Sequence, residues 1–321
     1  MNLNPESRED KATISDILQA FAVMRANGFH FYRSFMSVLS LDDTEAVCGA
    51  TMPVRHGVLG PSGTVAAGAL GTLADEALAN ALFRAVAEPV RMATTGLTVQ
   101  LLRETRARQI RAESEVVSLS RRIGVARCEM TDEQGALVAT ATGTYAIRRV
   151  RADDPRPFAS QGDTTNQLQP RPLALHDLKG QELEILKHVE GYLGAPGQDG
   201  PLADYLGIEW RKRGDGESSG RWPLGPHIRN SWGVVHGGAM FGALAVAALA
   251  CIPGDPAGRI LEQHVQFVRP GQGNQLYVES HLLRQGQSVI FVQATAKDAH
   301  QKTIASALVT VKGTQRARTG A

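Results

Sequence analysis

The order of apolar and polar positions predicts two long buried helices, the first of them followed by a series of strands. Residues 64–86 and 235–252 are apolar on nearly every side, as in a helix that has no face toward water. After the first helix, four segments alternate small or apolar side chains with polar ones, which is the period-two pattern of a strand. These segments are residues 97–102, 110–120, 124–131 and 136–147.

The short connections between these strands favour antiparallel pairing. An apolar helix next to such strands predicts an α+β fold in which an antiparallel sheet curls round the helix. Amphipathic helices are expected at residues 14–28 and 183–192, and loops at residues 87–95 and 253–261. Residues 151–172 are rich in Pro, Asp, Asn and Gln without periodicity, and are interpreted as a linker.

The chain also contains an internal repeat. TVQLLR at residues 98–103 matches HVQFVR at residues 264–269, 166 positions further on, and this spacing continues through the strands that follow. Upstream the spacing becomes 170, which pairs Gly68 with Gly238. Two similar copies in 321 residues predict two domains.

We place the first domain at residues 1–150, the linker at 151–172 and the second domain at 173–321.

Composition narrows the classes of function. Lys and Arg total 34 against 32 Asp and Glu, a net charge of +2 that offers no broad basic face for nucleic acid. Three widely spaced cysteines favour a reducing compartment over a disulfide framework. The N-terminus is polar, and the longest apolar run is too short to span a bilayer. We expect a cytoplasmic protein that binds neither nucleic acid nor membrane. His56 and His227 have no partner at metal-ligand spacing, so both are interpreted as structural or surface residues, and no metal is expected.

The segment NSWGVVHGG at residues 230–238, at the start of the second helix, resembles the hotdog-fold thioesterases. It is most similar to the phenylacetate-degradation branch of acyl-CoA thioesterases, whose pattern is N-x-x-G-x-x-H-G-G, an acidic residue nine positions after the His, and a strand ending in F-L-R-P. The second copy has QFVRP at residues 266–270, whereas the first copy ends in Glu104 where the Pro would be.

Each copy lacks what the other has. Nine positions after His236 stands Ala245, so the second copy has no acid, but the repeat places Asp75 of the first copy at the equivalent position. Conversely, His236 and Gly237 correspond to Ala66 and Ala67 in the first copy.

In the family, two hotdog units pair side by side, and each site takes its H-G-G from one unit and its acid from the other. The resemblance therefore implies two tandem hotdog domains paired as an internal pseudo-dimer with one complete site. It further implies hydrolysis of acyl-CoA without a cofactor, since coenzyme A is part of the substrate. We expect the chains to associate into a homo-oligomer, as a dimer of double-hotdog chains.

The chemistry assigns roles to these residues. The Gly237 N–H, at the first turn of a helix, is unpaired within that helix and can stabilise an oxyanion. Asp75 is expected to act as general base or as nucleophile, and the sequence does not separate these roles. A carboxylate in an apolar helix should have a raised pKa. Asn230 is expected to position the thioester or His236, and Thr94 to orient water, as a Ser or Thr often does in the family.

The substrate-binding candidates are Gly238 and Thr95, with three arginines in the strand-to-strand region where coenzyme A phosphates often bind in the family. These arginines are Arg121, Arg122 and Arg284.

Structural interpretations stay open beside the functional ones. Asp75 could lie on a solvated helix face, and His236 could be a capping residue satisfied by backbone. The paired glycines could serve close packing, and the arginines could be plain surface. Two other functions also remain: an acyl-CoA-binding protein without catalysis, and an enoyl-CoA hydratase, which the separation of Asp75 and His236 disfavours.

Overall fold

The computed structural model describes most of the chain. The described residues are 8–28, 30–41, 48–86, 88–150, 170–171, 173–193, 197–253 and 258–313. The helices are α1 (Arg8–Asn27), α2 (Phe31–Phe35), α3 (Ala67–Ala85), α4 (Gln181–Leu193), α5 (Pro201–Leu206) and α6 (Gly237–Ala250). Short 3-10 turns are η1 (His56–Val58), η2 (Leu175–Asp177) and η3 (Pro226–Ile228).

The strands divide equally between the two halves of the chain. The first half contributes β1 (Leu39–Leu41), β2 (Cys48–Pro53), β3 (Val90–Leu101), β4 (Gln109–Leu119), β5 (Ile123–Asp132) and β6 (Leu137–Arg149). The second half contributes β7 (Glu209–Lys212), β8 (Glu217–Pro223), β9 (Ile260–Phe267), β10 (Gln275–Gln285), β11 (Val289–Lys297) and β12 (Thr303–Lys312).

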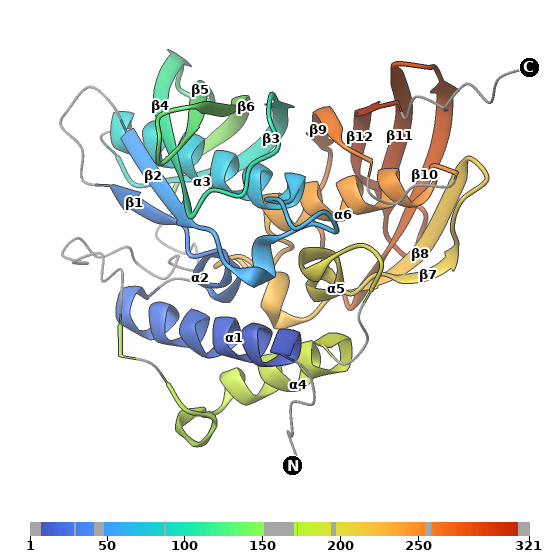
Figure 1. Ribbon diagram of the computed structural model, residues 1–321. Helices are drawn as coiled ribbons and strands as arrows, with labels where there is room; N and C mark the ends of the chain where they lie inside the picture. Colours follow the sequence, from blue (N-terminus) through green and yellow to red (C-terminus); the bar gives the residue numbers. More distant parts are fainter. Residues whose placement is uncertain are drawn as a thin grey trace, which may run out of the picture.

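All of these strands join in one antiparallel sheet, in the order β1-β2-β4-β5-β6-β3-β9-β12-β11-β10-β8-β7. The strand order of the second half is that of the first half in reverse, because β7 to β12 pair with one another as β1 to β6 do. Each half of the sheet curves round its own helix, α3 on one side and α6 on the other (Figure 1). The predicted α+β fold, two hotdog units side by side, is confirmed.

The two halves meet at the strand pair β3–β9. Thr98 lies opposite His264, its partner in the 166-residue repeat, and the Thr98 hydroxyl and His264 Nδ1 are 2.7 Å apart. A residue that faces its own repeat partner lies on the pseudo-twofold axis that relates the halves.

Small residues let α3 and α6 approach each other across the same axis. A Cβ on Gly71 would lie 2.3 Å from the ring of Phe241, which is its repeat partner, and a Cβ on Gly68 would lie 2.7 Å from the backbone of Gly242. Any larger side chain at either glycine would force the two helices apart. Atoms of one helix can therefore reach the end of the other.

Most of the predicted elements lie where the pattern placed them, with one clear error. The predicted loop at residues 87–95 is wrong, since β3 already begins at Val90. The run VRMATT pairs with β6 alone, since β9 pairs only with residues 96–100, and its side chains are mostly half-buried without an alternation of buried and exposed positions. The linker 151–172 lies almost wholly outside the described residues.

The two predicted amphipathic helices are present as α1 and α4, which pack together below the sheet (Figure 1). Arg25 of α1 forms a 2.6 Å ion pair with Glu182 of α4. Among the described helices, none is both long and apolar enough to cross a membrane.

Candidate active site

The N-terminus of α6 is organised by His236. This residue is the N-cap, and its Nδ1 accepts a 2.9 Å hydrogen bond from the Gly238 N–H. Gly237, the first residue of the helix, has no intrahelical acceptor for its own N–H, and no other described residue accepts it. This N–H is therefore available to a ligand at the positive end of the helix dipole.

Asp75 of α3 lies against this helix terminus from the other half of the molecule. A Cβ built on Gly237 would be 2.5 Å from Asp75 Oδ2, so only glycine leaves room for the carboxylate. The other oxygen, Oδ1, accepts hydrogen bonds from the Thr94 hydroxyl at 2.8 Å and the Tyr145 hydroxyl at 3.2 Å. Asp75 is buried, with 7% exposure, and is not on a solvated face.

Burial raises the pKa of Asp75 above its usual 3.8, which outweighs the opposite effects of His236 and of the Thr94 hydrogen bond. One oxygen is thus anchored by hydroxyl groups of the first half. The other faces the helix terminus of the second half.

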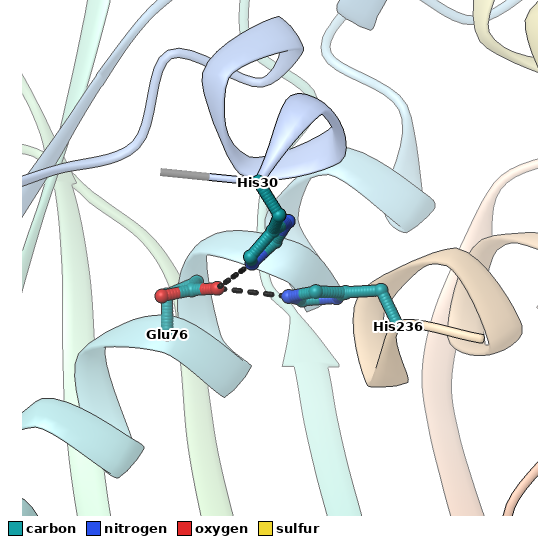
Figure 2. A group of neighbouring side chains, drawn as sticks. All are labelled: His30, Glu76 and His236. Atoms are coloured by element: carbon teal, nitrogen blue, oxygen red, sulfur yellow. Dashed lines mark hydrogen bonds and ion pairs between the residues drawn. The ribbon is translucent and has the colours of Figure 1, made fainter. Parts of the chain in front are cut away.

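A second carboxylate, Glu76, whose side chain is 11% exposed, joins two histidines (Figure 2). Its Oε1 lies 2.8 Å from His236 Nε2 and 3.8 Å from His30 Nε2. Its Oε2 lies 3.3 Å from an Arg33 guanidinium nitrogen. Burial opposes ionisation of Glu76, but Arg33, His236 and His30 together outweigh it and hold the pKa well below the usual range.

The group His30, Glu76 and His236 has the residue types of a metal site, with one ligand atom from each within 4.8 Å of the others. The hydrogen bonds do not fit that function. Both histidines are N-caps whose Nδ1 accepts a backbone N–H, from Arg33 for His30 and from Gly238 for His236. A neutral ring in that state carries its proton on Nε2, the atom that a metal would need. The arginine beside Glu76 disfavours a cation further.

The remaining predicted residues lie around this centre in different ways. Asn230 Oδ1 accepts from the N–H groups of Trp232 and Val234, so this oxygen shapes its own loop, and among the described residues no hydrogen bond joins Asn230 to His236. The Trp232 ring of that loop stacks 3.8 Å from the guanidinium of Arg91 on β3, which ties the loop to the first half.

Thr95 points away from the centre, because its hydroxyl donates to the Thr144 carbonyl at 3.0 Å. Gly238 packs against Thr72 of α3, with only 2.3 Å between a built Cβ and Thr72 Oγ1. Its contact is therefore the close helix packing that the sequence left open. The three candidate arginines are exposed at strand ends: Arg121 and Arg122 between β4 and β5, and Arg284 near the end of β10.

Sequence reasoning missed four residues of the site: His30, Arg33, Glu76 and Tyr145. Glu76 could have been noticed, since a second carboxylate follows Asp75 directly in an apolar helix. His30 and Arg33 belong to a separate short helix, α2, and no motif or spacing connects them to the H-G-G segment.

The pseudo-equivalent position in the other half lacks these groups. The N-cap of α3 is Ala66, which makes no side-chain cap. Ala67 occupies the position equivalent to Gly237, and Ala245 the position equivalent to Asp75. At the 170-residue spacing Glu76 becomes Val246 and His30 becomes Gly200. A pocket of about 90 Å³ lined by Ala66, Ala67, Ala245 and Val246, among others, lies there.

Both halves match thioesterase families. Residues 62–139 match the Thioesterase superfamily, and residues 226–312 match the family described as Acyl-CoA thioesterase N-terminal domain. A candidate esterase from Saccharolobus solfataricus is 26% identical over 112 residues, which cover 34% of this chain and 75% of that protein. Thioesterase-family sequence in both halves makes the protein a thioester hydrolase.

Solved structures show the same double architecture over most of the chain. A hotdog-fold protein of unknown function from Alicyclobacillus acidocaldarius has a TM-score of 0.55 at 14% identity, covering 88% of this chain and 97% of its own. A candidate thioesterase from Novosphingobium aromaticivorans has a TM-score of 0.55 at 16% identity, covering 86% and 98%. The TesB protein of Mycobacterium avium subspecies paratuberculosis has 0.55 at 11%, covering 85% and 95%. At these identities the likeness concerns the fold.

Proposed function

We propose that the protein hydrolyses acyl-CoA thioesters to a free acid and coenzyme A at one site that both halves build. The supporting observation is the approach of Asp75, from α3, to Gly237 at the start of α6, with room for no side chain between them. The pair joins the two functions that thioester hydrolysis needs: a donor for the developing oxyanion, and a group that activates water or attacks the carbonyl.

The thioester carbonyl oxygen would accept the Gly237 N–H. As the carbonyl carbon becomes tetrahedral, negative charge collects on that oxygen, and the helix dipole adds to the stabilisation. Removing one such donor typically costs about 3 kcal/mol of barrier. The N–H needs no reorganisation, because the His236 cap already fixes the turn.

Asp75 supplies the second half of the chemistry. As a base, it takes a proton from water while the water oxygen bonds to the carbonyl carbon; the C–S bond then breaks and coenzyme A leaves with a proton. As a nucleophile, Oδ2 bonds to the same carbon, the C–S bond breaks, and coenzyme A leaves as a thiolate that takes a proton from solvent. Water then cleaves the resulting anhydride, which releases the free acid and restores the Asp75 carboxylate. Either role needs the ionised carboxylate, and Thr94 holds one oxygen so that the other faces the substrate.

Coenzyme A as the thiol half of the substrate is supported by the family that residues 226–312 match. The N-x-x-G-x-x-H-G-G segment supports the phenylacetate-degradation branch. The equivalent position in the other half has Ala67 and Ala245 lining one pocket, with neither the glycine nor the acid. This supports a single catalytic site in each chain.

The test is thiol release from short, long and aryl acyl-CoAs by the wild type and by Asp75→Asn. The variant keeps the side-chain shape but supplies neither base nor nucleophile, so turnover should be abolished while the fold survives. Asp16→Asn is the matched control, since Asp16 is a half-buried carboxylate of α1 that accepts from the Gly57 N–H. Unchanged kcat in Asp75→Asn would remove the assigned residue. Tight binding without thiol release by the wild type would favour a non-catalytic acyl-CoA-binding protein.

A further inference from the structure

We propose that Glu76 is a positioning residue that fixes the tautomer of His236, and so keeps Asp75 Oδ2 and the Gly237 N–H free for the substrate. This inference rests on the proposed function. It concerns a residue that touches neither the thioester nor the attacking group.

The tautomer follows from the two hydrogen bonds of the His236 ring. A backbone N–H can only donate, so the 2.9 Å contact from Gly238 requires an unprotonated Nδ1. The ring proton then lies on Nε2 and donates to Glu76 Oε1 at 2.8 Å. The acceptor on Glu76 thus sets which nitrogen is free to cap α6.

The opposite tautomer would harm the site in two ways. A proton on Nδ1 would face the Gly238 N–H, donor against donor, and the cap of α6 would be lost. The same Nδ1 is 4.0 Å from Asp75 Oδ2, so its N–H would turn toward that oxygen. Asp75 would then be engaged by a hydrogen bond on the face where it must meet water or the carbonyl carbon.

Glu76 is built to remain an ionised acceptor. Arg33 lies 3.3 Å from Oε2, and His30, itself fixed as the N-cap of α2, directs Nε2 toward Oε1. Burial lowers the pKa of His30 to about 4, so this ring stays neutral near pH 7 and keeps its own Nε2 proton. The carboxylate therefore meets donors only.

The other half of the molecule argues that this cluster serves the chemistry and not the fold. There α3 begins with the same turn at Ala66, without a side-chain cap, and Val246, Gly200 and Ala203 replace Glu76, His30 and Arg33. The hotdog unit forms without any member of the cluster. All members are present only beside the Asp75–Gly237 pair.

The test is the protonation state of the histidine nitrogens, read by NMR in protein labelled with ¹⁵N-histidine. The wild type should show His236 protonated on Nε2 and bare on Nδ1. Glu76→Val, which has the residue of the other half and no acceptor, should move protons to Nδ1 of His236. Glu76→Gln keeps an amide oxygen as acceptor and should retain the wild-type tautomer. If Glu76→Val unfolds because Arg33 loses its carboxylate partner, the double variant Glu76→Val/Arg33→Ala gives the combination of residues found in the other half, Val246 and Ala203.

Kinetics should follow the tautomer. Glu76→Val should lower kcat about 10- to 100-fold with little change in KM, as when a histidine loses the carboxylate that orients it. Glu182→Gln is the matched control, because Glu182 is an arginine-paired glutamate on α4 whose side chain is 9% exposed, against 11% for Glu76. It should leave both the His236 signals and kcat unchanged.

The acid limb of the kcat/KM profile gives a second readout. The titratable groups that face Asp75 are Glu76 on the same helix, His236 of α6, Tyr145 of β6 and Tyr32 of α2. Glu76→Gln removes the neighbouring negative charge that raises the pKa of Asp75, so the acid limb should move to lower pH.

A wild-type His236 protonated on Nδ1 would overturn the inference, as would a Glu76→Val variant with unchanged tautomer and kcat. The NMR result does not depend on turnover. Failure of the proposed function would instead appear as a wild type that releases no thiol.

Discussion

Gly237→Ala tests the central contact most directly. The new Cβ would lie 2.5 Å from Asp75 Oδ2 and 3.2 Å from its Cγ, whereas unstrained contacts begin near 3.4 Å. The carboxylate must therefore retreat by about 0.9 Å, and a misplacement of about 1 Å at a reacting group costs on the order of 10²-fold in rate. We expect kcat/KM to fall by about that factor, equivalent to ~2.7 kcal/mol of transition-state stabilisation.

Stability should change far less than activity. Alanine is a better helix former than glycine, by roughly 0.5–1 kcal/mol, which offsets part of the strain. The assay is steady-state thiol release together with thermal unfolding. Ala67→Gly, at the equivalent helix position in the other half, is the matched control and should lose a little stability with no loss of kcat/KM. Wild-type kcat/KM in Gly237→Ala would refute the inference that Asp75 works at this distance.

Three further changes have defined outcomes. Thr94→Val removes the 2.8 Å hydrogen bond to Asp75 Oδ1 and should lower kcat/KM by about 10-fold, since hydrogen bonds to charged groups contribute ~1.5–3 kcal/mol. Thr95→Val is the control and should have little effect, because the Thr95 hydroxyl bonds to the Thr144 carbonyl. The wild-type kcat/KM should fall with decreasing pH through a pKa above the usual 3.8 of aspartate, because only the ionised Asp75 acts and burial raises its pKa. Thr94→Val should move this acid limb of the profile to higher pH, since the lost hydrogen bond lowers the pKa of Asp75. An acid limb at or below pH 3.8 would contradict the assignment of Asp75. Ala245→Asp should add no activity and should destabilise the fold, because Ala67, Ile260 and Val311 stand where Gly237, Thr94 and Tyr145 support Asp75; doubled thiol release would show that the pairing is wrong.

The sequence predicted the parts of the site that follow from periodicity and repeat. The two apolar helices and the spacing between copies place Asp75 at the position of Ala245 and His236 at the position of Ala66, so the paired units hold one acid and one H-G-G segment. The structure brings Asp75 against Gly237. This prediction succeeded because a sheet must cover each apolar helix and the two copies must pair. Residues at equivalent positions of the repeat therefore lie at equivalent positions in the two units.

The rest depended on contacts that no local pattern encodes. Thr94 and Thr95 are neighbours with equal chemistry, and only the β-bulge between Thr94 and Gly96 decides which of them faces Asp75. Asn230 was assigned by family likeness to the thioester or to His236, whereas its contacts are with its own loop. His30 reaches Glu76 from α2, and such a contact between distant segments leaves no trace in spacing.

The seam at Thr98 and His264 lies inside one polypeptide, whereas in a homodimer it would join two identical subunits. In a pair of identical subunits every amino-acid replacement occurs twice, so the loss of a catalytic group removes it from both sites at once. Fusion frees each copy to change alone. One interface could then specialise while its twin accumulated alanines without penalty, and the chain now carries its own record of the ancestral, symmetric arrangement.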